Sequence, residues 1–193
     1  MAKAQKRAAG ILARELKGRE EGIGRRTRRF LSGVTCQGRI LLEDTISALC
    51  QRGYEIRDEC GLSGPLLSCL EQGFLERGYD VIACPSPERP SRLEHLLIPE
   101  LGVAFVTSKP GMEYPGKPYR RVRLNALSHP ESKASLRFRS RMAGVLREEG
   151  VAALQDAKAA HDRLESVYNP YVDFEGVRAQ AAIEAGRLLS WLN

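Results

Sequence analysis

Residues 54–70, YEIRDECGLSGPLLSCL, combine a short apolar strand, a turn with two glycines and an apolar segment with helical spacing. This is the layout of a phosphate-binding loop, in which backbone N–H groups at the start of a helix point at an anion. The motif of such a loop, G-x-x-x-x-G-K-[ST], adds a lysine for the terminal phosphates and a hydroxyl for Mg²⁺. The stretch is therefore the first candidate for a nucleotide site.

The motif fits this stretch in shape and departs from it in chemistry. Aligned on the strand, Asp58 stands at the first glycine, Ser63 at the second, Gly64 at the lysine and Pro65 at the hydroxyl position. Gly61 falls at an inner position where such loops often carry glycine. Asp58 puts a negative charge where phosphates would lie, and proline offers neither hydroxyl nor N–H. Two interpretations stay open: a loop that keeps its shape without its chemistry, and a residual, lysine-free nucleotide site.

The remaining parts of a nucleotide site are also incomplete. The buried strand GVAFVTS ends in Thr107 and Ser108, where an acidic Mg²⁺ ligand would be expected. The five cysteines and three histidines show no zinc-ligand spacing, so no metal site is predicted. No catalytic residue is predicted either. Cations beyond this strand could replace the missing lysine from the carboxyl side of the sheet. These candidate phosphate-contacting residues are Lys109, Lys117, Arg120 and Arg121.

The elements that would position these residues alternate between strand and helix across residues 30–127. Patterning predicts a helix over 38–50, strands at 54–57, 79–84 and 102–107, a helix over 65–77, a proline-rich loop after residue 84 and an edge strand over 120–127. The continuous apolar run at 102–107 is typical of a buried parallel strand. Residues 30–127 are therefore expected to form an α/β domain.

Residues 128–193 show helical patterning alone. Ser128 and Glu131 have the spacing of a capping box, and Asn169-Pro170 ends a long amphipathic stretch. Asp173 can cap a last helix. We expect a C-terminal helical hairpin, packed on the α/β domain or extending from it.

Residues 1–29 contain most of the excess charge of the chain. They carry ten Lys or Arg and three Glu, a balance of +7 in a chain of net charge +6. This segment is interpreted as a solvated linker or, alternatively, as a basic arm for nucleic acid. The chain shows no apolar run of the roughly 20 residues that span a bilayer and no secretory signal, so a cytoplasmic protein without a membrane partner is expected.

Three stretches carry a resemblance to a known family. They are RRFLSGVTCQG, the segment from LEQGFLERGYDV through IPEL to AFVTS, and AKAAHDRLESVYNPYVDFEGV. Together they resemble the bacterial P-loop ATPase-like proteins with two tandem NTPase-like halves, and residues 29–190 are similar to one half, more to the second. The resemblance implies a P-loop NTPase-like three-layer parallel sheet with a helical hairpin. It also implies ATP with Mg²⁺ as the ligand, and residues 1–29 as the connector between halves.

Three functions follow from these observations. The favoured one is a non-catalytic P-loop-fold module that pairs with an active NTPase half or homologue, with a degenerate site at Gly61, Ser63, Gly64 and Pro65. The second is an ATPase or nucleotide kinase with a non-standard phosphate loop. The third is a nucleic-acid-binding protein that acts through residues 1–29.

Overall fold

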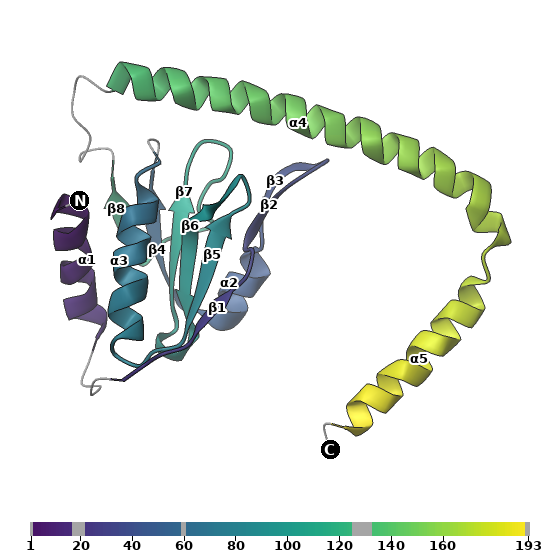
Figure 1. Cartoon of the computed structure of the whole chain (residues 1–193), viewed down its shortest axis with the longest axis horizontal. Helices are drawn as coiled ribbons and strands as arrows, with labels where there is room; N and C mark the ends of the chain where they lie inside the picture. The colour runs from purple at the N-terminus through teal and green to yellow at the C-terminus, as the bar shows by residue number, and fades with distance from the viewer. Residues whose placement is uncertain (1, 17–21, 59–60, 125–132, 192–193) are drawn as a thin grey trace. The chain divides into compact units, whose positions relative to one another are not determined.

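The computed structural model describes residues 2–16, 22–58, 61–124 and 133–191, and the chain forms two compact units, residues 1–152 and 153–193 (Figure 1). The first unit contains a six-stranded sheet, and the second contains only helices. In chain order the elements are α1 (Ala2–Glu15), β1 (Arg26–Arg28), β2 (Ser32–Thr35), β3 (Gly38–Leu41), α2 (Glu43–Leu49), β4 (Arg52–Arg57), α3 (Ser63–Leu75), β5 (Val81–Ser86), β6 (Arg89–Ile98), η1 (Pro99–Leu101), β7 (Val103–Ser108), β8 (Arg120–Arg123), α4 (Lys133–Tyr168), η4 (Asn169–Tyr171) and α5 (Phe174–Ser190).

The sheet has the strand order β1-β5-β6-β7-β4-β8. Strands β7, β4 and β8 are parallel neighbours, and β1 is parallel to β5. Strand β6 runs against β5 and β7 because the chain passes through all three as a meander. The expected mixed α/β class with a mostly parallel sheet is thus confirmed, and β6 is its departure from an all-parallel one.

Each face of the sheet has its own apolar core, because successive side chains of a strand point to opposite faces. On one face α3 packs against β5 and β6, and Phe74 contacts Phe105 of β7; Leu66, Leu70 and Phe74 are all fully buried there. On the other face Ile46 of α2 belongs to a second buried cluster that includes Leu97 of β6 and Val106 of β7. Strand β4 lies between β7 and β8, and its Tyr54, Glu55 and Ile56 are all buried.

Two local expectations were wrong. Residues 38–41, expected as the start of a helix, form β3, which pairs with β2 as a hairpin. Gly38 has φ +98 in the turn, a conformation that favours glycine. The proline-rich stretch after Cys84, expected as a loop, belongs to β5 and β6, which stay paired with a shift of register on either side of Pro85.

The basic N-terminal segment is part of the folded unit, which differs from a solvated linker or arm. Helix α1 buries Ala8 and Ile11 in the α3 core. A Cβ at Gly73 of α3 would lie 2.3 Å from Leu12 Cδ1, so glycine at this position lets the two helices approach closely. Strand β1 then adds Arg26–Arg28 to the sheet beside β5.

The second unit contains the end of α4, η4 and α5. Asp173 caps α5, with Oδ1 accepting from Gly176 N at 2.9 Å, as its sequence position predicts. Every described residue of α5 is exposed, so α5 buries no side chain against α4. The expected capping box at Ser128 and Glu131 lies outside the described residues. No helix among the described residues is long and apolar enough to cross a bilayer.

Candidate functional site

The loop between β4 and α3 leaves the sheet at the carboxyl end of β4. Asp58 N donates to Ser108 O at 3.0 Å, so the loop begins beside the end of β7. Gly61 has φ +72, and the helix starts at Ser63 with Pro65 in its first turn, where proline is well tolerated. The strand, turn and helix predicted from the sequence are therefore present, with the loop at the edge where open α/β sheets bind ligands.

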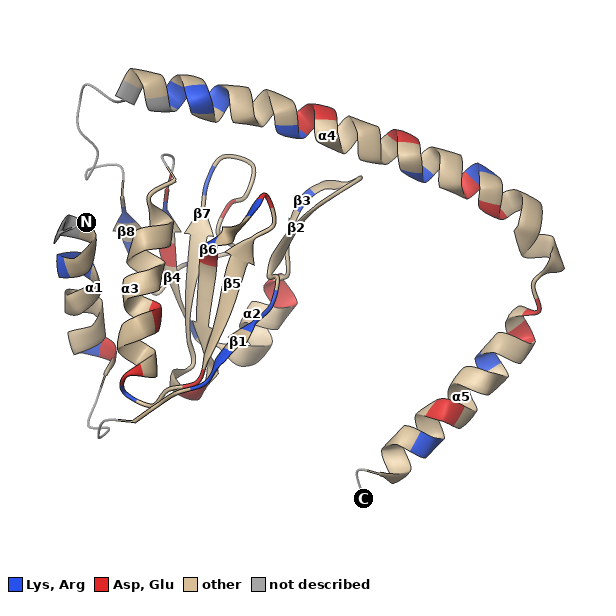
Figure 2. Cartoon of the chain, viewed as in Figure 1, with Lys and Arg blue, Asp and Glu red and all other residues tan. Residues whose placement is uncertain are grey.

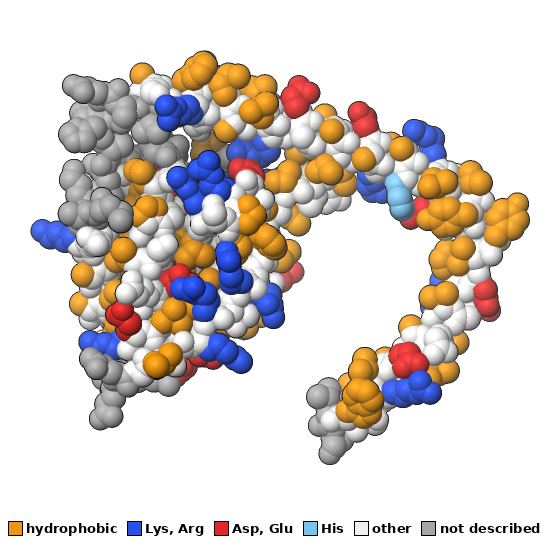
Figure 3. Space-filling view, in the orientation of Figure 1, with side chains coloured by type: hydrophobic (Ala, Val, Ile, Leu, Met, Phe, Trp, Pro, Cys, Tyr) orange, Lys and Arg blue, Asp and Glu red, His pale blue; other side chains and the backbone are white. Residues whose placement is uncertain are grey.

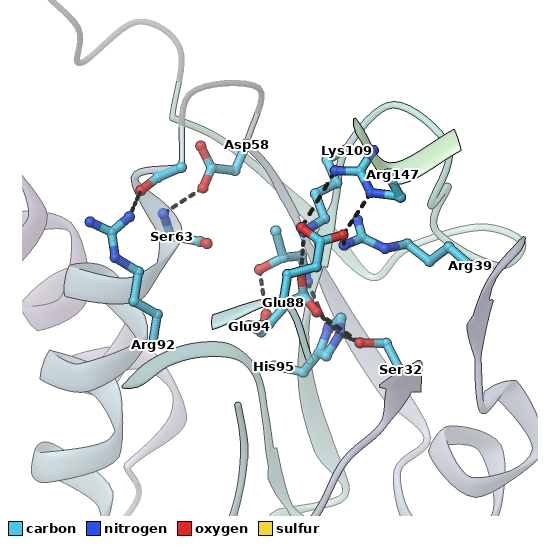
Figure 4. Close-up of polar contacts among 12 residues, drawn as sticks. Ser32, Arg39, Asp58, Ser63, Glu88, Arg92, Glu94, His95, Lys109 and Arg147 are labelled. Atoms are coloured by element: carbon cyan, nitrogen blue, oxygen red, sulfur yellow. Dashed lines mark hydrogen bonds and ion pairs between the residues drawn. The ribbon is translucent and has the colours of Figure 1, made fainter. Parts of the chain in front are cut away.

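A carboxylate of the chain itself accepts a hydrogen bond from the first turn of α3. Asp58 is buried, and its Oδ2 accepts a hydrogen bond from Ser63 N at 2.6 Å (Figure 4). The first N–H groups of a helix carry partial positive charge and lack partners within the helix. Asp58 supplies the negative charge that a bound phosphate would otherwise bring to this position.

The other loop residues are placed as follows. Gly61 O accepts from Arg92 Nη1 at 3.4 Å, which ties the turn to β6. Ser63 and Gly64 are buried, and Pro65 is exposed. A Cβ at Gly64 would lie 3.7 Å from Leu93 O, an ordinary contact, so a side chain fits there. None of the described loop residues is itself a cation, and the Arg92 guanidinium that contacts the loop comes from β6.

The four candidate cations are not gathered around the loop. Lys109 follows β7 at the loop's edge of the sheet, and it pairs with Glu94. Arg120 and Arg121 begin β8 opposite Tyr54 and Glu55, before the end of β4. Arg121 pairs with Glu55, whose Oε1 also accepts from the Ser108 hydroxyl at 2.8 Å, while Arg120 lies over the Tyr119 ring. Lys117 is exposed in the segment before β8.

A buried polar cluster that the sequence did not reveal lies where β6 and β7 meet β2. Glu94 Oε2 accepts from the Ser32 hydroxyl at 2.7 Å and lies 3.6 Å from His95 Nε2, and Glu94 Oε1 pairs with Lys109 (Figure 4). The Thr107 hydroxyl donates to Glu94 O. These five side chains come from three strands and the loop after β7, so only the folded sheet brings them together.

The charges of this cluster are fixed by its contacts. Burial alone would raise the pKa of the Glu94 carboxyl, but the hydrogen bond with His95 and the Lys109 charge outweigh it and hold this pKa well below its usual range. Burial lowers the pKa of His95, so the imidazole is neutral. Its Nδ1 accepts from Thr107 N at 3.2 Å, which leaves the proton on Nε2.

This arrangement does not form a hydrolytic triad despite containing Ser, His and Glu. His95 Nε2 lies 3.4 Å from Ser32 Oγ and carries the ring proton, so it cannot take the proton of that hydroxyl. Glu94 lies on the same side of the ring instead of holding Nδ1. His95 is completely buried, out of reach of a substrate. The cluster therefore ties β2 to the sheet and has no acyl-transfer geometry.

A second charged group is centred on Glu88. Its Oε1 pairs with Arg39, whose side chain is 3% exposed, and accepts from Arg147 Nε at 2.6 Å (Figure 4). Nε and Nη1 of Arg39 have no partner among the described residues. Burial lowers the pKa of the Arg39 guanidinium, and Glu88 opposes this effect. One carboxylate thus serves two guanidinium groups.

The described residues contain one group that could ligate a metal ion, formed by His161, Asp162 and Glu165 on α4. The side chains of this group are exposed or half-buried, and Lys158 Nζ donates to both oxygens of Asp162 at 2.8 Å. Such i, i+4 ion pairs are common on solvated helices. Neither the exposure of these side chains nor the pairing of Asp162 with Lys158 favours a metal ion at this position.

A basic groove lies between α1 and β8. It has a volume of about 610 Å³, within the range of ligand pockets. Lys6, Arg7 and Arg14 line it from α1, and Arg120 and Arg121 from β8. Figure 2 shows Lys and Arg on α1, which belongs to the segment that the sequence presented as a basic linker or arm.

The class that the fold defines is a mixed α/β unit with a six-stranded, mostly parallel sheet and a loop-to-helix turn at the carboxyl end of a central strand. No protein-family model, curated protein or solved structure matches the chain.

Proposed function

We propose that the chain is a non-catalytic module with a P-loop NTPase-like fold, and that it has given up nucleotide binding at its loop. The observation that carries the proposal is the Asp58 carboxylate, bonded at 2.6 Å to Ser63 N at the start of α3. Support comes from the place of that turn, directly after a central parallel strand and before a helix on the sheet face.

The Asp58 carboxylate opposes a phosphate in two ways. It occupies an N–H group that a phosphate would need, and it adds like charge at the same position. Two like charges 4 Å apart repel by roughly 1 kcal/mol in water and about 4 kcal/mol near a protein surface. Gly64 and Pro65 bring neither a cation nor a hydroxyl that would offset this cost.

Two carboxylates near this edge of the sheet are already engaged by cations. Glu55 pairs with Arg121, and Glu94 pairs with Lys109. The hydroxyls at the end of β7 are engaged as well, Thr107 with Glu94 O and Ser108 with Glu55. A metal-nucleotide complex that used these residues as ligands would have to break these contacts first.

The proposed role is that of a partner for an active NTPase half that resembles this chain. The support is the apolar surface of the second unit, where Phe174, Leu188, Leu189 and Trp191 are between 45% and 80% exposed. Figure 3 shows hydrophobic side chains along the helices of this unit. Proteins that act alone seldom leave such large apolar surfaces to water.

Calorimetric titration of ATP tests the proposal, with and without Mg²⁺, on the natural chain and on the variant Asp58→Gly, Gly64→Lys, Pro65→Ser. We expect no Mg²⁺-dependent binding to the natural chain and Mg²⁺-dependent binding to the variant. Mg²⁺ dependence separates binding at the loop from simple attraction of phosphates to basic surfaces. Mg²⁺-dependent binding by the natural chain would overturn the proposal and favour an ATPase or nucleotide kinase with a non-standard loop.

A further inference from the structure

We infer that the groove between α1 and β8 binds a ligand with several linked phosphate groups, at a site separate from the loop after β4. The groove is built from two walls that are far apart in sequence. Lys6, Arg7 and Arg14 form one wall, and Arg120 and Arg121 form the other. The floor includes the aromatic side chain of Tyr54.

The groove has an excess of positive charge that the protein neutralises only in part. Its lining contains five cations and no carboxylate. Among the described residues, Arg121 pairs with Glu55, whereas Lys6, Arg7 and Arg120 form no ion pair with a carboxylate. Cations that face one another across a groove repel, and an anion between them relieves this repulsion.

Helix α1 spaces its cations along the groove, with Lys6 near its start and Arg14 in its last turn. Lys6 and Arg14 lie two turns apart and thus about 12 Å along the helix axis. This span lets one chain of phosphates contact several cations at once.

The walls are held in place by contacts that a ligand need not break. Arg52 pairs with Glu15 of α1 at 2.9 Å and lies 5.4 Å from the centre of the Tyr119 ring. Arg120 lies 5.3 Å from the same ring centre. Glu15 also accepts from the Tyr54 hydroxyl. Glu15 is therefore already engaged by Arg52 and Tyr54.

Gly10 keeps the groove open. It lies on α1 between the cationic side chains, and a Cβ at this position would meet nothing within 4 Å. Glycine inside a helix costs about 1 kcal/mol relative to alanine. A side chain here would therefore favour the helix and fill the space that we assign to the ligand.

Titration with inorganic tripolyphosphate in the presence of EDTA tests the inference on the full chain. We expect saturable binding that weakens about ten-fold or more, equivalent to about 1.4 kcal/mol, in Arg7→Gln, Arg120→Gln. Gly10→Leu should weaken it to a similar degree without any change of charge. The control Arg77→Gln, Arg178→Gln removes the same charge from exposed positions outside the groove and should bind within about two-fold of the natural chain.

Each result decides the question. Absence of saturable binding, or equal weakening in the control, would overturn the inference. So would binding of a short single-stranded oligonucleotide without binding of tripolyphosphate, because that result assigns the surface to nucleic acid. The inference does not depend on the proposed function, since binding in the groove requires neither Mg²⁺ nor any substitution in the loop.

Discussion

Asp58 Oδ2 lies 2.6 Å from the backbone nitrogen of Ser63, so a carboxylate five residues earlier in the chain caps α3. The bond joins the end of β4 to the start of the helix across the whole turn. It stabilises the turn by the same interaction that makes the turn unfavourable for a phosphate.

Substitution Asp58→Ala should lower the free energy of unfolding by about 1 to 2 kcal/mol, the usual cost of losing a helix cap. Urea denaturation followed by circular dichroism measures it. Asp162→Ala is the matched control, since Asp162 is exposed and pairs with Lys158 one turn earlier on the same helix, where the loss should be below about 0.5 kcal/mol. Equal losses in both variants would contradict the capping role.

The Glu94 carboxylate should stabilise the fold at neutral pH and lose this effect in acid. Its folded-state pKa is held below the ordinary value of 4.5, so the stabilisation is present above about pH 4.5 and is lost as the pH falls through the folded pKa. Glu94→Gln should cost about 1 to 3 kcal/mol at pH 7. Urea titrations at pH 7 and at pH 3 to 4 should show the difference from the natural chain narrowing in acid; a constant difference would contradict the assignment.

His95 should remain neutral, with its proton on Nε2. Burial lowers its pKa from the ordinary 6.5, and Nδ1 accepts from Thr107 N. The unfolded chain takes up a proton below about pH 6.5 that the folded chain does not, so this contribution to stability is present above that pH and declines below it. Long-range ¹H–¹⁵N spectra between pH 5 and 8 should show a single, unchanged Nε2–H tautomer. A cross-peak that shifts with pH as free imidazole does would refute this.

Helix α1 should contribute to stability as a packed element. Ile11 is 4% exposed and lies in the core with α3, so Ile11→Ala should cost about 2 to 4 kcal/mol. Ile23→Ala removes the same atoms from a side chain that is fully exposed and should have little effect. Both are measured by urea denaturation. Equally small changes in the free energy of unfolding for both variants would favour a solvated arm for residues 1–29.

The apolar face of α5 should bind a hydrophobic dye. Leu188 and Leu189 are 58% and 61% exposed, so Leu188→Gln, Leu189→Gln should reduce the fluorescence of bound anilinonaphthalene sulfonate. The free energy of unfolding should stay within about 0.5 kcal/mol, as for other surface substitutions. Arg178→Gln on the same helix is the control for dye binding. A large loss of stability would mean that these leucines are buried in the folded chain.

The elements around the loop were predictable because local signals agree there. The apolar run at Val103–Ser108 and the glycine and proline after Arg57 indicate strand, turn and helix without reference to the rest of the chain. The β2–β3 hairpin was missed because Ile40 and Leu41 share helical spacing with Ile46. The signal that could have found it is Gln37-Gly38, a glycine turn between two short apolar stretches.

The candidate site was predictable from the sequence only where its residues are close together along the chain. The adverse charge of Asp58 is visible in the sequence, but its bond to Ser63 N is not. Glu94 and Lys109 are brought together by the antiparallel strand β6, and a parallel arrangement would have placed Glu94 at the other edge of the sheet. The basic groove depends on where α1 packs, against α3 and beside β8, and the sequence of α1 alone does not show this position.

The pairing of β1 with β5 has a consequence for the growing chain. Arg25 and Asp80, which are joined by a 2.7 Å hydrogen bond beside this pairing, are 55 residues apart in sequence. During translation, α1 and β1 leave the ribosome well before the strand and the helix that they contact. Their buried side chains, Ala8 and Ile11 among them, therefore stay in water until α3 and β5 have been made, and the N-terminal segment completes the first unit late.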